Sequence, residues 1–323
     1  MKPHTVLLIG TRSSTLALRQ TEWARKRLLD AGHGTERVDV HTTGDMIPDV
    51  PLSRIGGRAI FTKQIDDAML ERKIDLAVHS LKDLPTTLPD GIVIAAVAER
   101  EDPADAVVGR QGGPVTWETI PMHGVVATGS VRRKAQLLHV RPDLEVVDLR
   151  GNVDTRLRKL DGTEGWSAVV LAAAGLIRLG LEGRIGQRLP PEVMLPAPGQ
   201  GALALTARSG DAWAMGAARE AVHHAPTALA VAAERAFLRT LQGGCQVPVA
   251  ALATVTGGTV ELYGRVVALA GDRAVEGIET GPAADEAAAA AVGTALAERL
   301  LDGGAGEILA AVRAGSMPSV PEP

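Results

Sequence analysis

Short apolar runs of strand length alternate along this chain with stretches of helical periodicity, and this order restricts the possible folds. The first series comprises Thr5–Ile9, Leu16–Leu29, Val38–Thr42, Phe61–Glu71 and Asp75–His79. The second comprises Val125–Thr128, 130–139, Glu145–Leu149, 153–160 and Ala168–Leu171. Strand, helix and strand in succession are typical of parallel strands whose connecting helices cover the sheet. The sequence therefore predicts two α/β units.

The pattern changes after about residue 225. A long helix is expected at Thr227–Leu241, followed by alternating strands at 249–255, 260–267 and 273–280 and by a helix at Ala284–Leu301. Strands followed by helices indicate an α+β arrangement, which we expect to form a third, smaller domain. Two segments rich in proline, glycine or charge, Glu99–Asp105 and Pro190–Gly201, are predicted to cross between domains.

Composition excludes several classes of protein. Cys245 is the only cysteine, so the chain forms no internal disulfide, and any sulfur chemistry is that of a thiol in a reducing compartment. Aromatic residues make up 2% of the chain and the formal net charge is −4. Rows of stacking aromatics and a broad basic surface are both missing, so we expect no nucleic-acid partner.

Membrane insertion and export are not expected either. No stretch approaches the roughly 20 uninterrupted apolar residues of a membrane-spanning helix. The segment Met1–Gly10 has an apolar run too short for a secretory signal and lacks a small-residue cleavage site. We therefore expect a cytoplasmic protein.

Cationic side chains follow four of the predicted strands directly, beside small hydroxyl or amide residues. Ligands of α/β sheets bind beyond the carboxyl ends of the strands, where helix N-termini present free N–H groups. A lone arginine there is usually solvated, but the repetition favours a cleft for a ligand with several carboxylates or phosphates. The candidate binding residues are Arg12, Ser14, Lys82, Thr128, Ser130, Arg132, Arg133, Arg150, Arg156 and Arg178.

Asp83 stands among these cations, where a carboxylate would weaken the binding of an anion. Two explanations are open. Asp83 either balances the charge of Lys82, or it handles a proton or a developing positive charge.

Cys245 follows Gly243 and Gly244, just past the end of the helix predicted at Thr227–Leu241. A single cysteine is most often a small buried apolar residue, but two glycines also allow a turn that presents the thiol. The helix C-terminus does not stabilise a thiolate, so nearby cations would have to activate it.

The segment Thr43–Ala59 is long and polar, with prolines, glycines, Arg54 and Arg58. It is either a lid, with Phe61 at its end, or a flexible surface loop.

Other motifs predict no further site. Gly199-Gln200-Gly201 follows a proline-rich segment rather than a strand, which excludes a dinucleotide fingerprint. His223-His224 has no second cluster at metal-ligand spacing and is better interpreted as a helix start, so no metal site is predicted.

Five segments together resemble the porphobilinogen deaminase family, also called hydroxymethylbilane synthases, and they extend over essentially the whole chain. They are Thr11-Arg12-Ser13-Ser14-Thr15-Leu16-Ala17-Leu18, Ala77-Val78-His79-Ser80-Leu81-Lys82-Asp83-Leu84-Pro85, Arg150-Gly151-Asn152-Val153 through Thr155-Arg156-Leu157, Pro198-Gly199-Gln200-Gly201-Ala202 and Gly243-Gly244-Cys245-Gln246-Val247-Pro248. Gly129 departs from the family pattern, because a hydroxyl residue is expected at that place.

The resemblance implies an α/β fold with two domains similar to periplasmic binding proteins and a smaller α+β C-terminal domain. The first domain would be completed by chain that returns after the second. The expected boundaries are 1–100 with 200–220, 101–199, and 221–323, the last carrying Cys245. A monomer is expected.

The resemblance also implies a dipyrromethane cofactor joined to Cys245 by a thioether. On it, four porphobilinogen units are added head-to-tail with loss of ammonia, and hydrolysis releases a linear tetrapyrrole, the precursor of porphyrin and heme. Each pyrrole ring carries an acetate and a propionate, which explains the need for arginines. Asp83 would stabilise the positive charge that forms as ammonia leaves.

Two other functions compete with this interpretation. A non-enzymatic two-lobed protein could bind an anion in the same cleft, but it leaves Asp83 and the third domain unexplained. A thiol-dependent acyl transferase is disfavoured, because no histidine is placed by the sequence to activate Cys245.

Overall fold

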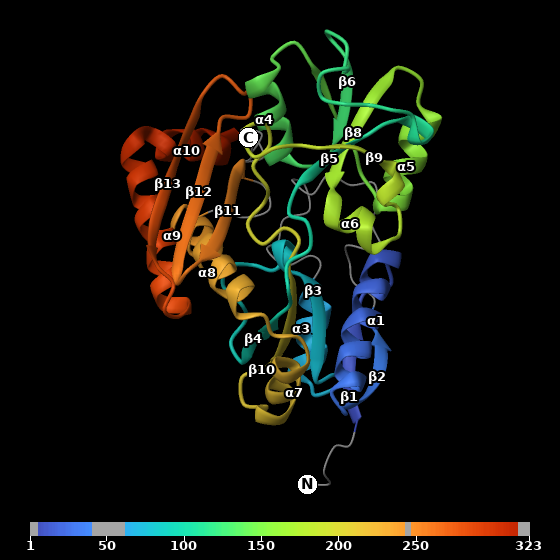
Figure 1. Cartoon of the computed structure of the whole chain (residues 1–323), viewed down its shortest axis with the longest axis vertical. Coiled ribbons are helices and arrows are strands. Elements are labelled where there is room, and N and C mark those ends of the chain that lie inside the picture. The colour runs from blue at the N-terminus through green and yellow to red at the C-terminus, as the bar shows by residue number, and fades with distance from the viewer. Residues whose placement is uncertain (1–5, 41–61, 243–246, 316–323) are drawn as a thin grey trace, which may run out of the picture.

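A computed structural model of the chain describes residues 6–40, 62–242 and 247–315. These residues form two five-stranded sheets and one three-stranded sheet, each covered by helices (Figure 1). Along the chain, strands of the two larger sheets alternate with helices. The smallest sheet belongs to an α+β unit at the C-terminal end. The predicted fold class, two α/β domains plus a smaller α+β domain, is confirmed.

The sheet of the first domain has the strand order β2-β1-β3-β10-β4. Its strands are β1 Val6–Thr11, β2 Gly34–Asp39, β3 Leu76–Ser80, β4 Ile92–Val97 and β10 Leu203–Arg208. The helices of this domain are α1 Thr15–Asp30, α3 Lys63–Leu70 and α7 Ala212–Val222. The strand β10 runs antiparallel to both β3 and β4, so a late part of the chain is an integral strand of the first sheet.

The sheet of the second domain repeats this arrangement in the order β7-β6-β8-β5-β9. Its strands are β5 Asp105–Val108, β6 Val125–Thr128, β7 Glu145–Asp148, β8 Trp166–Ala172 and β9 Ile185–Arg188. Its helices are α4 Val131–Val140, α5 Val153–Gly162 and α6 Ala173–Arg178, with short 3₁₀ turns at Arg110–Gly112 and Glu182–Arg184. Here β5 is the antiparallel strand. Both sheets therefore align the carboxyl ends of parallel strands beside helix N-termini, as a ligand site requires.

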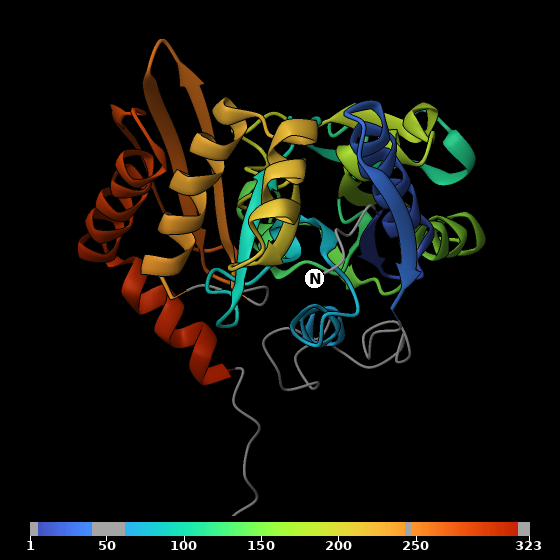
Figure 2. The same cartoon turned by 90° about the horizontal axis from the view of Figure 1, so that it is seen from below.

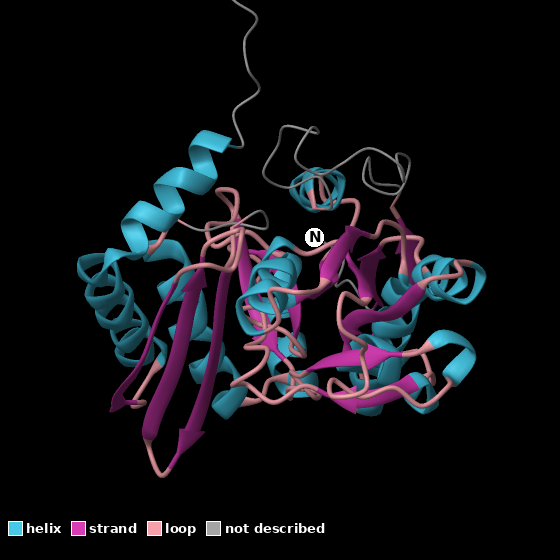
Figure 3. Ribbon diagram, turned by 90° about the horizontal axis from the view of Figure 1, so that it is seen from above, coloured by secondary structure: helices cyan, strands magenta, loops and turns pink. Residues whose placement is uncertain are grey.

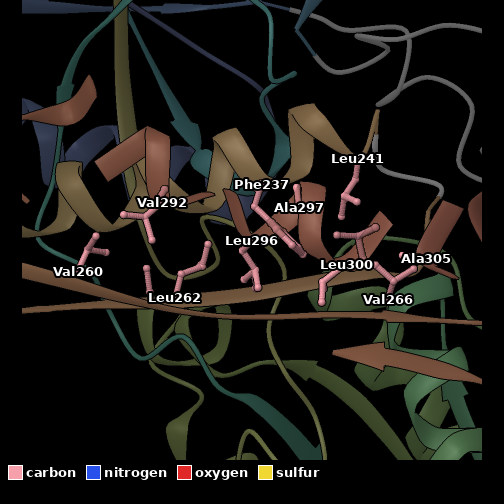
Figure 4. Packing of buried hydrophobic residues seen from close by; sticks show 14 of the residues in the cluster. Phe237, Leu241, Val260, Leu262, Val266, Val292, Leu296, Ala297, Leu300 and Ala305 are labelled. Atoms are coloured by element: carbon pink, nitrogen blue, oxygen red, sulfur yellow. The ribbon is translucent and has the colours of Figure 1, made fainter. Parts of the chain in front are cut away.

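The third domain packs a meander of β11 Val249–Thr256, β12 Thr259–Val267 and β13 Ala274–Pro282 against α8 Ala225–Thr240, α9 Glu286–Leu300 and α10 Gly306–Gly315, with a π-helical turn at Leu301–Ala305. Its core surrounds the fully buried Phe237 (Figure 4). A Cβ atom at Gly293 would lie 2.0 Å from the carbonyl oxygen of Ala233, so α8 and α9 approach each other closely. Glycine and alanine thus fill a core that has few aromatic side chains.

Two neighbouring segments cross between the first and second domains. The amide of Ala98 donates to the carbonyl of Leu203 at 2.9 Å, and the amide of Glu101 donates to the carbonyl of Gly201 at 3.1 Å. At Gly201, where φ is +89°, a Cβ atom would lie 2.2 Å from the Glu101 carbonyl oxygen. Only glycine allows the two crossing segments to lie this close.

A buried carboxylate on α8 connects the crossing segments to the third domain. Glu234, which is 0% exposed, accepts from both terminal nitrogens of Arg100 at 2.6 and 3.0 Å. It also accepts from the amide of Gly199 at 2.6 Å and from the amide of Ala253 at 2.7 Å. The third domain therefore lies beside the other two and is attached where they meet (Figures 2 and 3).

The strands and helices predicted within the described residues are found, with their ends shifted by at most four residues. Seven further elements were not predicted from the sequence: β4, β5, β9, β10, α6, α7 and α10. His224 is the N-cap of α8 and accepts from the amide of Thr227, which confirms that the histidine pair precedes a helix. Among the described residues, none of the helices has the length and apolar character needed to cross a membrane.

Candidate active site

The predicted hydroxyl residues lie at the carboxyl ends of strands and cap the helices that follow. The hydroxyl of Ser14 accepts from the amide of Ala17 at the start of α1, and that of Ser130 accepts from the amide of Arg133 at the start of α4, each at 3.4 Å. The buried hydroxyl oxygen of Thr128 accepts from the amide of Ser130 at 3.3 Å. Each hydroxyl keeps its own proton for donation, so these helix N-termini are suited to hold anions.

Lys82 and Asp83 lie in the 3₁₀ turn Leu81–Asp83, which directly follows β3. The ammonium of Lys82 donates to the side-chain oxygen of Gln200 at 3.1 Å. Asp83 is exposed and forms no ion pair with any residue in the described ranges. Asp83 and Lys82 therefore form no direct ion pair, and whether Asp83 serves to balance the charge of Lys82 stays a prediction.

Asp83 nevertheless shares its surroundings with cations from both domains. Burial and repulsion from Arg133 lower the pKa of Lys82 to about 8, while the charge of Asp83 acts in the opposite direction. The same carboxylate counteracts the lowering of the pKa of Arg156, on α5 in the second domain. The structure thus brings Asp83, Lys82 and Arg156 together across the two domains.

Arg156 has the features of a guanidinium group prepared for an anion. Burial and repulsion from Arg133 and Arg150 lower its pKa to about 10. Its Nε is buried and has no hydrogen-bond partner within the part of the chain that the structure describes. Arg150 pairs with Asp148 at 3.1 Å and is half-buried. An unpaired buried N–H beside the cations Arg133 and Arg150 favours binding of a carboxylate from outside the protein.

Arg132 and Arg133 are held by a residue that the sequence analysis did not single out. Both guanidinium groups pair with Asp105, Arg132 at 2.6 Å and Arg133 at 2.7 Å, and each is only 4% exposed. Burial alone would raise the pKa of Asp105, but the two arginines outweigh burial and hold that pKa well below its usual range. In this structure the two arginines bind a carboxylate of the protein itself, and their predicted contact with carboxylates of cofactor or substrate stays a prediction.

Gln200 connects this buried cluster to the first domain. Its amide nitrogen donates to Asp105 at 2.9 Å and to the carbonyl of Pro103 at 2.8 Å, while its oxygen accepts from Lys82. Gln200 is 0% exposed. Neither Gln200 nor Asp105 was predicted as a site residue. An acidic residue at the start of the apolar run Ala106–Val108 was the available signal for Asp105.

Arg12 and Arg178 lie at other edges of the same region. The charge of Arg12 lies close enough to buried His79 to contribute, after burial, to lowering the pKa of that imidazole to about 4. Arg178, at the end of α6, donates to the carbonyl of Gly201 at 2.6 Å and lies near Glu101. Arg178 therefore contacts a crossing segment, and nothing in the structure brings it beside Asp83.

Gly129, the departure from the family pattern, has a packing explanation. A Cβ atom at this position would lie 2.3 Å from the carbonyl oxygen of Leu149 and 3.8 Å from a terminal nitrogen of Arg156. A hydroxyl residue would therefore require the backbone after β7 to shift.

Several predicted residues lie outside the described ranges. They are Cys245 and the residues of the expected lid, Arg54, Arg58 and Phe61, together with the segment 43–59. Their expected roles stay predictions.

The described residues suit a ligand that carries several carboxylates. Four cations, Lys82, Arg133, Arg150 and Arg156, gather here: Arg133 lowers the pKa of both Lys82 and Arg156, Arg150 also lowers that of Arg156, and one buried N–H of Arg156 has no partner in the described structure. A dipyrromethane, with an acetate and a propionate on each ring, provides this number of charges. No group of His, Cys, Asp and Glu side chains in the described ranges is arranged to hold a metal ion.

Comparison with known families gives two adjoining matches. The description "Porphobilinogen deaminase, dipyromethane cofactor binding domain" matches residues 7–215, and "Porphobilinogen deaminase, C-terminal domain" matches residues 228–302.

Curated relatives match over nearly the whole length. A porphobilinogen deaminase of Moorella thermoacetica is 49% identical over 310 residues, covering 95% of this chain and 97% of the relative. One of Desulforudis audaxviator is 50% identical over 313 residues, covering 96% and 99%. Among solved structures, a periplasmic substrate-binding protein of an ABC transporter from Coxiella burnetii matches with a TM-score of 0.42 and 12% identity, covering 71% of this chain and 96% of that one.

Proposed function

The chain belongs to the porphobilinogen deaminase family, and from this premise we propose which of its residues carry out the reaction. The protein is a hydroxymethylbilane synthase, a transferase of porphyrin and heme biosynthesis with a dipyrromethane cofactor. It joins four porphobilinogen units head-to-tail, releases ammonia at each addition and hydrolyses the product to hydroxymethylbilane. A non-enzymatic anion-binding protein is not favoured, because both family matches are to the deaminase.

Cys245 attaches the cofactor in this proposal. It is the only thiol in the chain, and a thioether requires a sulfur nucleophile. The bound dipyrromethane supplies a nucleophilic pyrrole end for the first addition. Arg12, Lys82, Arg150 and Arg156 hold the carboxylates of cofactor and substrate, with donors from Ser14, Thr128 and Ser130.

Arg132 and Arg133 play a different part, because Asp105 already occupies their guanidinium groups. They contribute positive potential and fix the start of α4, so that the side chains at the end of β6 keep their places. Arg178 stabilises the crossing segment through the Gly201 carbonyl.

Asp83 is the catalytic residue of the proposal. The observation that carries this role is an exposed carboxylate, without an ion pair among the described residues, beside the cations that hold the substrate. When ammonia leaves porphobilinogen, positive charge develops on the pyrrole ring and its nitrogen. A carboxylate fixed beside that nitrogen stabilises the charge, and no ion pair with a described residue competes for it.

We propose three domains, 1–100 with 200–220, 101–199, and 221–323, which agrees with the place of β10 in the first sheet. The protein acts as a monomer in the cytoplasm on porphobilinogen alone, without nucleic acid or membrane. The single cysteine suits a reducing compartment, and the net charge of −4 disfavours a phosphate backbone as partner.

The intact mass of the purified protein tests the attachment. We expect an excess that matches two linked pyrrole units in the wild type and its loss in Cys245→Ser. The matched control is Asp83→Asn, which keeps the adduct because it leaves the thiol untouched. An unmodified mass in active wild-type protein, or an adduct retained by Cys245→Ser, would contradict the proposed attachment site.

A further inference from the structure

A cavity of about 330 Å³, apart from the candidate active site, lies where the first and third domains meet. Its walls come from the edge strand β4, the end of α7, the length of α8 and the first turns of α9. None of the residues of the candidate active site lines it. Most of the wall residues are alanine, valine or isoleucine, and a volume of this size is at the lower limit of small-molecule pockets.

Positive groups predominate among the charged residues of this cavity. Arg219, Arg235 and Arg239 line it together with His223, and among the described lining residues Glu286 alone is acidic. Arg235 and Arg239 are four positions apart on α8, so their charges repel each other, and this repulsion contributes after burial to lowering the pKa of Arg235 to about 10. An anion bound between the two arginines would relieve this repulsion.

These arginines have N–H groups left to donate. Arg235 uses one terminal nitrogen for the carbonyls of Pro85 and Thr86, and Arg219 uses its Nε for the carbonyl of Ala95. Arg239 is exposed and has neither a hydrogen bond nor an ion pair with any residue in the described ranges. Ala287 and Ala290, in the first turns of the 15-residue helix α9, bring the positive end of a helix dipole to the same cavity.

We propose that this cavity is a second binding site, for a small anion with two or more carboxylate or phosphate groups, separate from the site that holds the cofactor. Arg239 and Arg235 bind the anion from α8, and Arg219 binds it from α7. The alanine-lined walls restrict the ligand to a small molecule rather than an extended acidic chain.

The site is connected to the catalytic segment through Arg235. The carbonyls that Arg235 holds belong to Pro85 and Thr86, two and three residues after Asp83. An anion that draws Arg235 toward the cavity weakens these bonds. Occupancy is therefore expected to change the turnover of porphobilinogen.

Calorimetric titration of the holoenzyme with citrate and, separately, with inorganic phosphate, at matched ionic strength, tests the site. We expect saturable binding of one equivalent, weakened about tenfold or more in Arg239→Gln, which corresponds to losing about one charge-assisted hydrogen bond. Glu286→Gln should tighten binding, because it removes the one carboxylate among the described lining residues of the cavity. Arg273→Gln, on the same domain but outside the cavity, should leave binding unchanged.

The two titrations distinguish the ligand classes, since a carboxylate site binds citrate more tightly and a phosphate site binds phosphate more tightly.

Absence of saturable binding of either anion would overturn the proposal. Binding that Arg156→Gln weakens and Arg239→Gln does not would also overturn it, by locating the anion in the active site. Unchanged kcat and KM at saturating citrate would overturn the connection to Asp83. If Arg239→Gln fails to fold, Glu286→Gln tests the site instead. Tighter anion binding by this variant would support the proposal, and unchanged binding would contradict it.

Discussion

Two carboxylates lie among cations at the boundary between the first two domains, and they differ in their exposure to solvent and in their bonding partners. Asp105 is 0% exposed and accepts from two arginines and a glutamine. Asp83 is exposed and has no ion pair with any described residue, although Lys82 and Arg156 lie within electrostatic reach. The saturated cluster around Asp105 is suited to maintain structure, and the unsaturated one around Asp83 to bind and react.

Asp105→Asn should have the largest effect on stability. It leaves Arg132 and Arg133 buried without a compensating charge, which is expected to cost about 3–5 kcal/mol of unfolding free energy. Urea denaturation followed by circular dichroism measures the loss. A loss below about 1 kcal/mol would show that the two clusters do not differ as described.

Asp83→Asn should reverse this pattern, with little change in stability and a large loss of activity. The removal of a group that stabilises developing charge typically lowers kcat by about 10²–10³-fold. Steady-state turnover of porphobilinogen and urea denaturation of the same preparation should be compared. If kcat stays at the wild-type value, Asp83 does not stabilise the transition state.

Arg156→Gln tests whether the unpaired guanidinium group binds the ligand. Loss of one charge-assisted interaction of about 1.5–3 kcal/mol predicts a decrease in kcat/KM of about 10–150-fold. Arg158→Gln is the matched control, because Arg158 lies two positions away on α5 and is exposed. Equal effects of the two substitutions would refute a specific role for Arg156.

Lys82 lies between the two clusters and should give the smallest effect, visible as a pH dependence. Its pKa of about 8 is below that of a free lysine, so it loses its charge as pH rises through 8. We expect KM for porphobilinogen to rise up to about tenfold between pH 7.5 and 9. Lys82→Arg, which stays charged, should remove this rise. A KM that rises equally in both proteins would mean that another group titrates.

The same pKa shift has an opposite consequence for stability. Because the folded state favours the neutral form of Lys82, the unfolded state binds more protons between about pH 8 and 10.5, so this residue increases stability as pH rises through that range. Activity and stability should therefore change in opposite directions above pH 8.

Sequence reasoning found the αβ alternation and the arginines, because strand periodicity and residues at strand ends are local features. It missed β10, because Leu203–Arg208 follows a proline-rich segment and pairs with strands more than 100 residues earlier in the chain. It treated Arg133 and Arg156 alike. Arg133 pairs with Asp105 and Arg156 does not, and this difference depends on a residue about 28 and about 51 positions earlier in the sequence, respectively. Gln200 was recognised only as part of a family motif, and its bridging role depends on contacts between domains.

The placement of Glu234 has a consequence for chain growth. One carboxylate binds both crossing segments and lies on α8, the helix that leads toward Cys245. Any rotation of the first domain against the second must bend these same segments. The arginines carried by the two larger sheets would therefore move farther than the residues around Glu234, so that they could follow a chain that lengthens between the two domains.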